Sequence, residues 1–265
     1  MACRNAYKTN SRYIGRLPEI KKTPTKNNVT HLVFGVDSGY PSNEILQNNL
    51  TLLEWVARNK IYPAFWCRNL TGEGCLTKEE VKFLRRKACK IAPIYCTKAA
   101  KDTEERGLHE AQLAVRRALE LAVPRGNVIF LEIVAEENAT RNYLRGYAKG
   151  LIKEGYTPGF KANTDATFPF DREFSRGMQT DRDVFERCLV YAVAPSLTEY
   201  QNIRTTHLIH PDNWTPFAPS GMTRRDIAIW QYGRDCHPIE SMTEKVITFN
   251  LNLIRNDNVM IEKMF

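Results

Sequence analysis

The feature that most constrains the fold is an alternation, starting after about residue 30, of short apolar runs with amphipathic helical stretches. In the first unit, HLVFGVD (31–37) is typical of a buried parallel strand, and 43–59 carries apolar residues at helical spacing. A second helix is predicted at 77–89, where Thr77 and Glu80 have capping-box spacing. Further helices are predicted at 108–122, 138–154, about 172–187 and about 242–255. The predicted strands are 31–37, 61–67, 90–96, 127–134, 157–163, 188–194, 206–210 and 226–232.

Strands that alternate with helices in this way are parallel and joined by crossovers. The 265 residues are close to the roughly 250 of a typical barrel of eight strand-helix units. We therefore predict a single (β/α)8 TIM-type barrel over 31–265, irregular in units six and seven, where 196–205 and 211–225 are too short or too proline-rich for full helices. A doubly wound sheet is the alternative, and the lack of a GxGxxG or GxxxxGK[ST] loop counts against it. Residues 1–30, polar and basic, are expected to form an arm without regular structure.

Composition sets limits on partners and compartment. The net charge of +8 favours acidic partners, but the basic residues are spread along helices, and no nucleic-acid-binding motif is present. The seven cysteines form no CxxC pair and no zinc-type spacing, so we expect free thiols, no metal site and no cofactor. No signal peptide and no membrane span are found, which suggests a cytoplasmic protein, or one released by lysis or a non-Sec route.

Carboxylates near the predicted strand ends are the catalytic candidates, because barrel sites lie at the carboxyl ends of the strands. Asp37 ends the first strand, although an Asx-turn would also explain it. Glu132 lies in the apolar run IFLEIV, where burial raises a carboxyl pKa, as suits the general acid of a glycosidase. The alternative is an ion pair with an arginine such as Arg68 inside the barrel mouth. Glu136 follows in AEEN and is the third candidate, with a loop or helix start as its simpler interpretation.

Aromatic and polar residues near the strand ends are candidates for substrate binding. Trp66, Tyr95 and Trp230 are placed where sugar clefts use aromatic faces, although core packing would explain any one of them. The polar candidates are Arg68, Lys161, Asn163, Gln231 and Asp235.

Several segments, in consistent order from about 31 to 236, resemble a known family. They include HLVFGVDSGYPS, FWCRNL, LTKEEVKFLRRKACKIAPIYC, EAQLAVRRALELAVPRGNVIFLEI, YLRGYAKGLIKEGYTPGFKAN and IAIWQYG. Together they are similar to the glycoside-hydrolase-like domain family that is related to the family 25 lysozymes. The resemblance implies a barrel whose cleft binds a peptidoglycan-like glycan, with Asp37 on strand one and Glu132 at the first acidic position of a strand-four D-x-E pattern.

The sequence departs from that family at three points. Val134 occupies the second acidic position, Lys161 stands where the family often has tyrosine, and GRDCHPI replaces the acidic motif after WQY, which leaves Asp235 as its closest candidate. Glu136 could substitute for the missing acid only if the strand continues or bulges.

Three functions therefore compete. The first is a hydrolase of amino-sugar polymers, in which Glu132 or Glu136 protonates the leaving oxygen and Asp37 stabilises positive charge on the sugar or orients its acetamido group. The second is an inactive barrel that serves as a glycan-binding or structural module. A basic nucleic-acid enzyme is the third and least supported.

Overall fold

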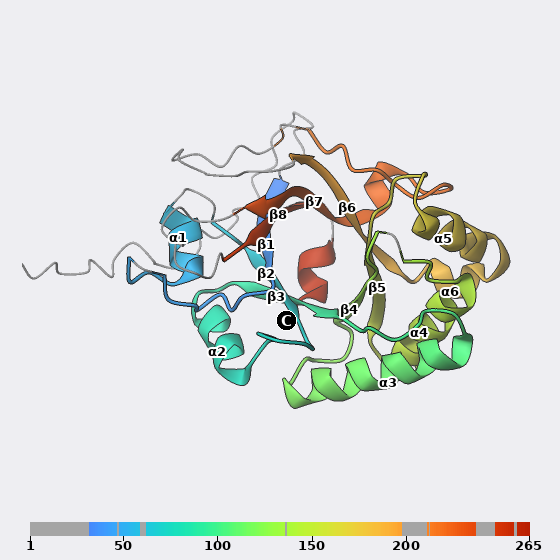
Figure 1. Cartoon of the computed structure of the whole chain (residues 1–265), viewed down its shortest axis with the longest axis horizontal. Helices are drawn as coiled ribbons and strands as arrows, with labels where there is room; N and C mark the ends of the chain where they lie inside the picture. Colours follow the sequence, from blue (N-terminus) through green and yellow to red (C-terminus); the bar gives the residue numbers. More distant parts are fainter. Residues whose placement is uncertain are drawn as a thin grey trace, which may run out of the picture.

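The computed structural model of the chain shows a closed barrel of eight strands (Figure 1). It describes residues 32–46, 48–58, 62–135, 137–197, 211, 213–236, 247–256 and 259–265, without the side chains of 195–197. The strands are β1 Leu32–Ser38, β2 Phe65–Asn69, β3 Lys90–Tyr95, β4 Val128–Glu132, β5 Thr157–Ala162, β6 Leu189–Leu197, β7 Ile227–Cys236 and β8 Phe249–Arg255. The predicted (β/α)8-type barrel is confirmed, whereas the predicted arm at 1–30 lies outside the described residues.

The last strand departs from the prediction. Neighbours from β1 to β7 pair in parallel, but β8 is antiparallel to both β7 and β1. The predicted eighth strand, 226–232, is instead part of β7, and the predicted seventh, 206–210, lies outside the described residues. The helix predicted at about 242–255 is wrong: FNLNLIR forms β8, with polar and apolar side chains alternating as a strand between two faces requires.

The helices follow the strands on the outside of the barrel (Figure 1). Thr77, Thr103 and Thr140 accept hydrogen bonds from the first turns of α2, α3 and α4, which fixes where these helices begin. The first helix is shorter than predicted, because Ile45 bridges to Thr51 and the chain turns there. The helices are α1 Leu52–Arg58, α2 Lys78–Arg86, α3 Glu104–Glu120, α4 Arg141–Lys153, α5 Pro169–Thr180 and α6 Arg182–Phe185, with 3-10 turns η2 Arg224–Asp226 and η4 Val259–Lys263.

The irregularity predicted for units six and seven is visible in the described part of the β6–β7 connection, where η2 is the helical element. Among the described residues, no helix combines the length and the apolar character that crossing a bilayer requires.

Two apolar layers form the core. Inside the barrel, Phe65, Phe130 and Tyr191 pack with smaller side chains. Met260 and Met264, in and just after η4, belong to the same cluster. The larger layer lies between strands and helices. Figure 1 shows η4, in red, within the ring of strands. The barrel is therefore filled from its amino end, and the carboxyl ends of β1 to β7 remain for polar side chains.

Helices α3 and α4 approach each other closely through glycines. A Cβ on Gly146 would lie 2.1 Å from the carbonyl oxygen of Glu104, and one on Gly107 would lie 2.2 Å from that of Tyr143. Because real side chains do not tolerate such distances, only glycine allows this contact, which sets the position of the first turn of α4.

Candidate functional site

Three charged side chains from β1, β4 and β5 meet inside the barrel at the carboxyl ends of these strands; we call them the mouth triad. The Lys161 Nζ lies 2.5 Å from Oδ2 of Asp37 and 2.9 Å from Oε1 of Glu132. Asp37 and Lys161 are buried, with 4% and 8% of the side chain exposed, whereas Glu132 keeps 32% exposed. The ammonium therefore lies between the two carboxylates, and solvent reaches the triad mainly on the side of Glu132.

Further inward-facing groups fix the triad. The Asn250 Nδ2, at the start of β8, donates to Oδ2 of Asp37 at 3.2 Å. The Tyr191 hydroxyl lies 3.5 Å from the same oxygen and donates to Asn252 at 2.8 Å. The Lys161 Nζ also lies 5.4 Å from the centroid of the Tyr191 ring. Oδ2 of Asp37 is consequently contacted by Lys161 and Asn250 at the same time.

The electrostatics of the triad differ from the sequence expectation. The positive charge of Lys161 lowers the pKa of Glu132, against the opposing effect of burial, and a hydrogen bond from the Cys96 thiol at 3.2 Å also lowers it. Burial alone would lower the pKa of Lys161, but the charges of Asp37 and Glu132 outweigh it and raise that pKa. The expectation of a raised Glu132 pKa is therefore wrong, because it did not include a buried cation.

Arg68 is not the partner of Glu132. Its side chain is fully buried outside the barrel, where it forms a two-point ion pair with Glu80 of α2 at 2.8 and 3.1 Å. It also donates to the carbonyl oxygens of Ser38 and Gly74. This guanidinium ties the loops after β1 and β2 to α2 and so holds the scaffold together.

The aromatic residues predicted to line the cleft are buried on the outer side of the strands. Trp66 is 0% exposed, Tyr95 donates to Glu110 of α3 at 2.7 Å, and Trp230 donates to the carbonyl oxygen of Ala194 at 2.8 Å. Successive side chains of a strand point to opposite faces, so the neighbour of an inward-facing residue faces the helices. The predicted convergence of Asp37, Glu132 and Trp230 on one mouth is thus wrong for Trp230.

The remaining candidate residues differ in how exposed they are. Gln231 is buried at 2% exposure, and Asn163 is partly exposed just after β5. Asp235 is exposed near the end of β7, where its backbone amide donates to Asn250 Oδ1. Glu136 lies outside the described residues, and Val134, at the position of the missing acid, is 55% exposed.

Two relevant residues were missed by the sequence reasoning. Asn250 was assigned to a helix, although its place in the alternating FNLNLIR was the available signal. Phe217 is 52% exposed, and its carbonyl oxygen accepts a hydrogen bond from Thr164, which follows β5 at the mouth. The loop that contains Phe217 is held further at Ser220, whose backbone amide and hydroxyl both donate to the carboxylate of Asp171 on α5. No local pattern in the sequence places this loop beside β5.

Among the described residues, no group of three or more His, Cys, Asp or Glu side chains is arranged to hold a metal ion. The described cysteines are free thiols: Cys67, Cys75, Cys89, Cys96, Cys188 and Cys236. Burial, followed by the charge of Glu132, raises the pKa of the Cys96 thiol at the mouth, which keeps it protonated.

Comparison with known proteins agrees with this architecture. Residues 65–249 match the family model described as Rv2525c-like, glycoside hydrolase-like domain. An uncharacterized B. stearothermophilus protein shares 22% identity with a TM-score of 0.69, over 88% of this chain and 100% of that one. The Clostridium perfringens spore cortex lytic enzyme SleM shares 14% identity with a TM-score of 0.53, over 88% and 70%.

A family GH25 lysozyme from Aspergillus fumigatus shares 12% identity with a TM-score of 0.50, over 88% of this chain and 98% of that one. No curated protein matches the chain in sequence. At these identities the structures show a common fold alone, and the resemblance inferred from the sequence is confirmed.

Proposed function

We propose that this chain, which belongs to the Rv2525c-like, glycoside hydrolase-like domain family, binds an amino-sugar polymer such as peptidoglycan at its barrel mouth without cleaving it. The choice of ligand is supported by the shared fold with SleM, a spore cortex lytic enzyme, and with a family GH25 lysozyme. The mouth triad alone supports the absence of cleavage.

The observation that carries the proposal is the position of Lys161 between the two carboxylates. Glycoside hydrolysis needs a protonated carboxyl to donate to the leaving oxygen, and lysozyme-type enzymes raise the pKa of that group by burial. Here the ammonium of Lys161 lowers the pKa of Glu132, so this carboxyl is ionised near neutral pH and has no proton to give.

The same cation opposes the second requirement of cleavage. The transition state develops positive charge on the sugar ring, which a nearby carboxylate normally stabilises. Asp37 already shares its Oδ2 with Lys161 and Asn250, and the ammonium itself would repel an oxocarbenium ion placed between the carboxylates. Both carboxylates therefore act as structural partners of Lys161 and as acceptors for hydroxyl or amide groups.

Phe217 supplies the apolar surface that sugar binding requires. It is exposed, and its loop is held at both Thr164 and α5, so little conformational freedom is lost when a ring stacks on it. In the proposed complex, a pyranose ring lies on Phe217 while its polar groups face Asn163 and the exposed side of Glu132.

The test measures binding and cleavage on the same material. Purified protein is mixed with insoluble bacterial walls, and co-sedimentation reports binding while turbidity reports lysis from pH 4 to pH 8. We expect sedimentation of the wild type and no fall in turbidity. Phe217→Ala should weaken sedimentation, whereas Leu119→Ala, which removes another exposed side chain at the far end of α3, should not.

Two results would overturn the proposal. Lysis by the wild type would contradict the absence of cleavage, and its loss in Glu132→Gln would show that Glu132 is a working acid. A failure of the wild type to sediment with walls or with chitin would remove the glycan-binding role itself.

A further inference from the structure

A pocket of about 330 Å³ lies outside the barrel, between the start of α4 and the first turns of α5. It is lined by Thr140, Arg141, Asn142, Glu173 and Arg176. Both helices follow strands whose carboxyl ends form the mouth, so the pocket lies toward the same side of the molecule as the mouth triad. None of its lining residues belongs to that triad.

The charges at this pocket are unequal. Oε2 of Glu173 accepts from the backbone amide of Arg141 at 3.1 Å. Its Oε1 contacts Arg172 at 2.9 Å and Arg176 at 3.4 Å. These two arginines keep 54% and 61% of their side chains exposed. The single carboxylate of Glu173 therefore accepts from a helix amide and contacts two guanidinium groups, whose side chains are more than half exposed.

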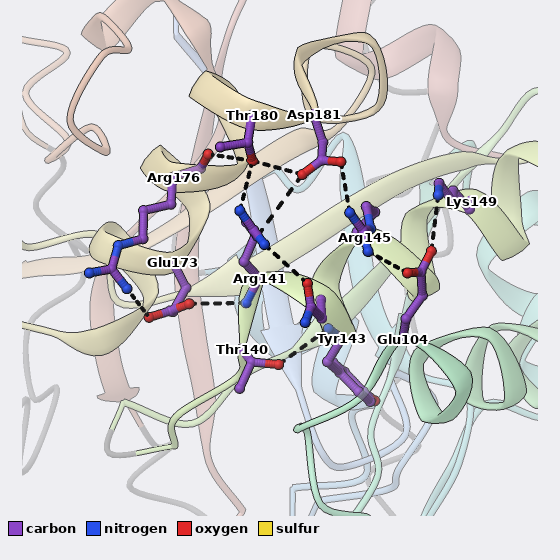
Figure 2. A network of polar contacts seen from close by, with 11 residues as sticks. Glu104, Thr140, Arg141, Tyr143, Arg145, Lys149, Glu173, Arg176, Thr180 and Asp181 are labelled. Atoms are coloured by element: carbon purple, nitrogen blue, oxygen red, sulfur yellow. Dashed lines mark hydrogen bonds and ion pairs between the residues drawn. The ribbon is translucent and has the colours of Figure 1, made fainter.

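The neighbouring cations have internal partners. Figure 2 shows Arg145 bound to both Glu104 and Asp181, while the guanidinium of Arg141 turns toward the hydroxyl of Thr180. The side chain of Arg176, by contrast, extends away from this network after its single contact with Glu173 (Figure 2). Arg172 and Arg176 are the more exposed arginines here, although Nη2 of Arg172 also contacts Oδ1 of Asn138 at 3.4 Å.

We propose that a phosphoryl group binds at the rim of this pocket, between Arg176, which lines it, and Arg172, which lies outside the lining but contacts the same oxygen of Glu173. A phosphate monoester carries between one and two negative charges near neutral pH and presents three acceptor oxygens. Guanidinium groups match such oxygens with parallel N–H donors. The inner side of each arginine rests on Glu173, so the phosphoryl group approaches from the solvent side and bridges the two.

Substitution of the arginines and substitution of Glu173 should change the affinity for phosphate in opposite directions. Loss of the arginines removes the attraction, whereas neutralising Glu173 removes a negative charge that competes for the same guanidinium groups. A general effect of salt on stability would not weaken phosphate binding in the arginine variant and strengthen it in the Glu173 variant.

The experiment titrates the whole chain with inorganic phosphate by calorimetry, with sodium chloride holding the ionic strength constant. We expect the Arg172→Gln/Arg176→Gln double variant to lose roughly tenfold or more in affinity, because each lost bond involves a charged group. Glu173→Gln should bind more tightly than the wild type. The control is Arg182→Gln on α6, where an arginine with 76% of its side chain exposed pairs with Glu186.

Equal affinity in the wild type and the double variant would overturn the proposal, as would an equal loss in Arg182→Gln. Thermal melting of each variant checks that the fold is kept. A second titration compares glucosamine 6-phosphate with inorganic phosphate, with glucosamine as the control that lacks the phosphoryl group. Tighter binding of the sugar phosphate than of inorganic phosphate identifies a phosphorylated sugar as the ligand, and equal binding identifies free phosphate.

Discussion

Replacing Lys161 by methionine tests the central element of the site. The substitution keeps a long unbranched side chain and removes the charge between Asp37 and Glu132. At an effective dielectric constant of about 20, each of the two contacts contributes roughly 6 kcal/mol of Coulomb attraction. Burying the ammonium, which is only 8% exposed, offsets several kcal/mol of this. We expect a net loss of about 3 to 5 kcal/mol in unfolding free energy at pH 7, the range found when one partner of a buried pair is removed.

The unfolding free energies of the wild type and of the variant should change with pH in opposite directions. In the wild type the folded-state pKa of Glu132 is lowered, so its stabilising effect is present above the unfolded pKa of about 4.3 and is lost as the pH falls through the folded value. In Lys161→Met the two carboxylates face each other without a cation, which raises the pKa of one of them. The variant therefore regains stability as the pH falls through that raised value.

Urea denaturation at pH 7 and at pH 4.5 measures both effects. The difference between wild type and variant should be largest at pH 7 and clearly smaller at pH 4.5. Lys149→Met is the matched control: this lysine, 47% exposed, pairs with Glu104 on the surface, and its loss should cost less than about 1 kcal/mol at either pH. A Lys161→Met deficit of the same size at both pH values would refute the reasoning, because it would reflect packing and not charge.

Three further outcomes follow from the structure. Arg68→Lys should destabilise the fold by about 1 to 3 kcal/mol in chemical denaturation, since an ammonium cannot reproduce the two-point contact with Glu80; wild-type stability would contradict this. Gly146→Ala should lower the melting temperature despite the better helix propensity of alanine, because its Cβ meets the backbone of Glu104. Thiol titration should give about seven groups in denaturant and far fewer in the native protein, and a count near one would mean disulfides.

Long periodic elements were predictable from the sequence, and pairings between distant segments were not. The amphipathic stretches of α3 and α4 show their period over several turns, and Thr103 and Thr140 mark where they begin. The strand β8 was missed because its seven residues are too short for a periodicity to dominate over the neighbouring sequence.

The same distinction between local patterns and distant pairings applies to the residues of the site. Asp37 and Glu132 were found because a carboxylate in an apolar strand needs an explanation. Lys161 was named as a binding candidate, but its pairing with these two carboxylates was not predicted, since its contact with Asp37 joins residues 124 positions apart. Trp66 and Trp230 were misplaced because strand side chains alternate between faces, so an error of one residue exchanges the barrel interior for the helix layer.

Because β8 is antiparallel to β1, the start of β1 and the end of β8 lie at the same edge of the barrel, and this bears on how the protein can be immobilised. Leu32, which begins β1, is paired with Arg255, which ends β8, and both lie at the edge opposite the mouth triad. A linker joined directly before Leu32 would therefore leave the barrel on the side away from the mouth. Coupled to a bead or a sensor chip through such a linker, the molecule would present its mouth outward, and immobilised layers would keep the proposed ligand face accessible.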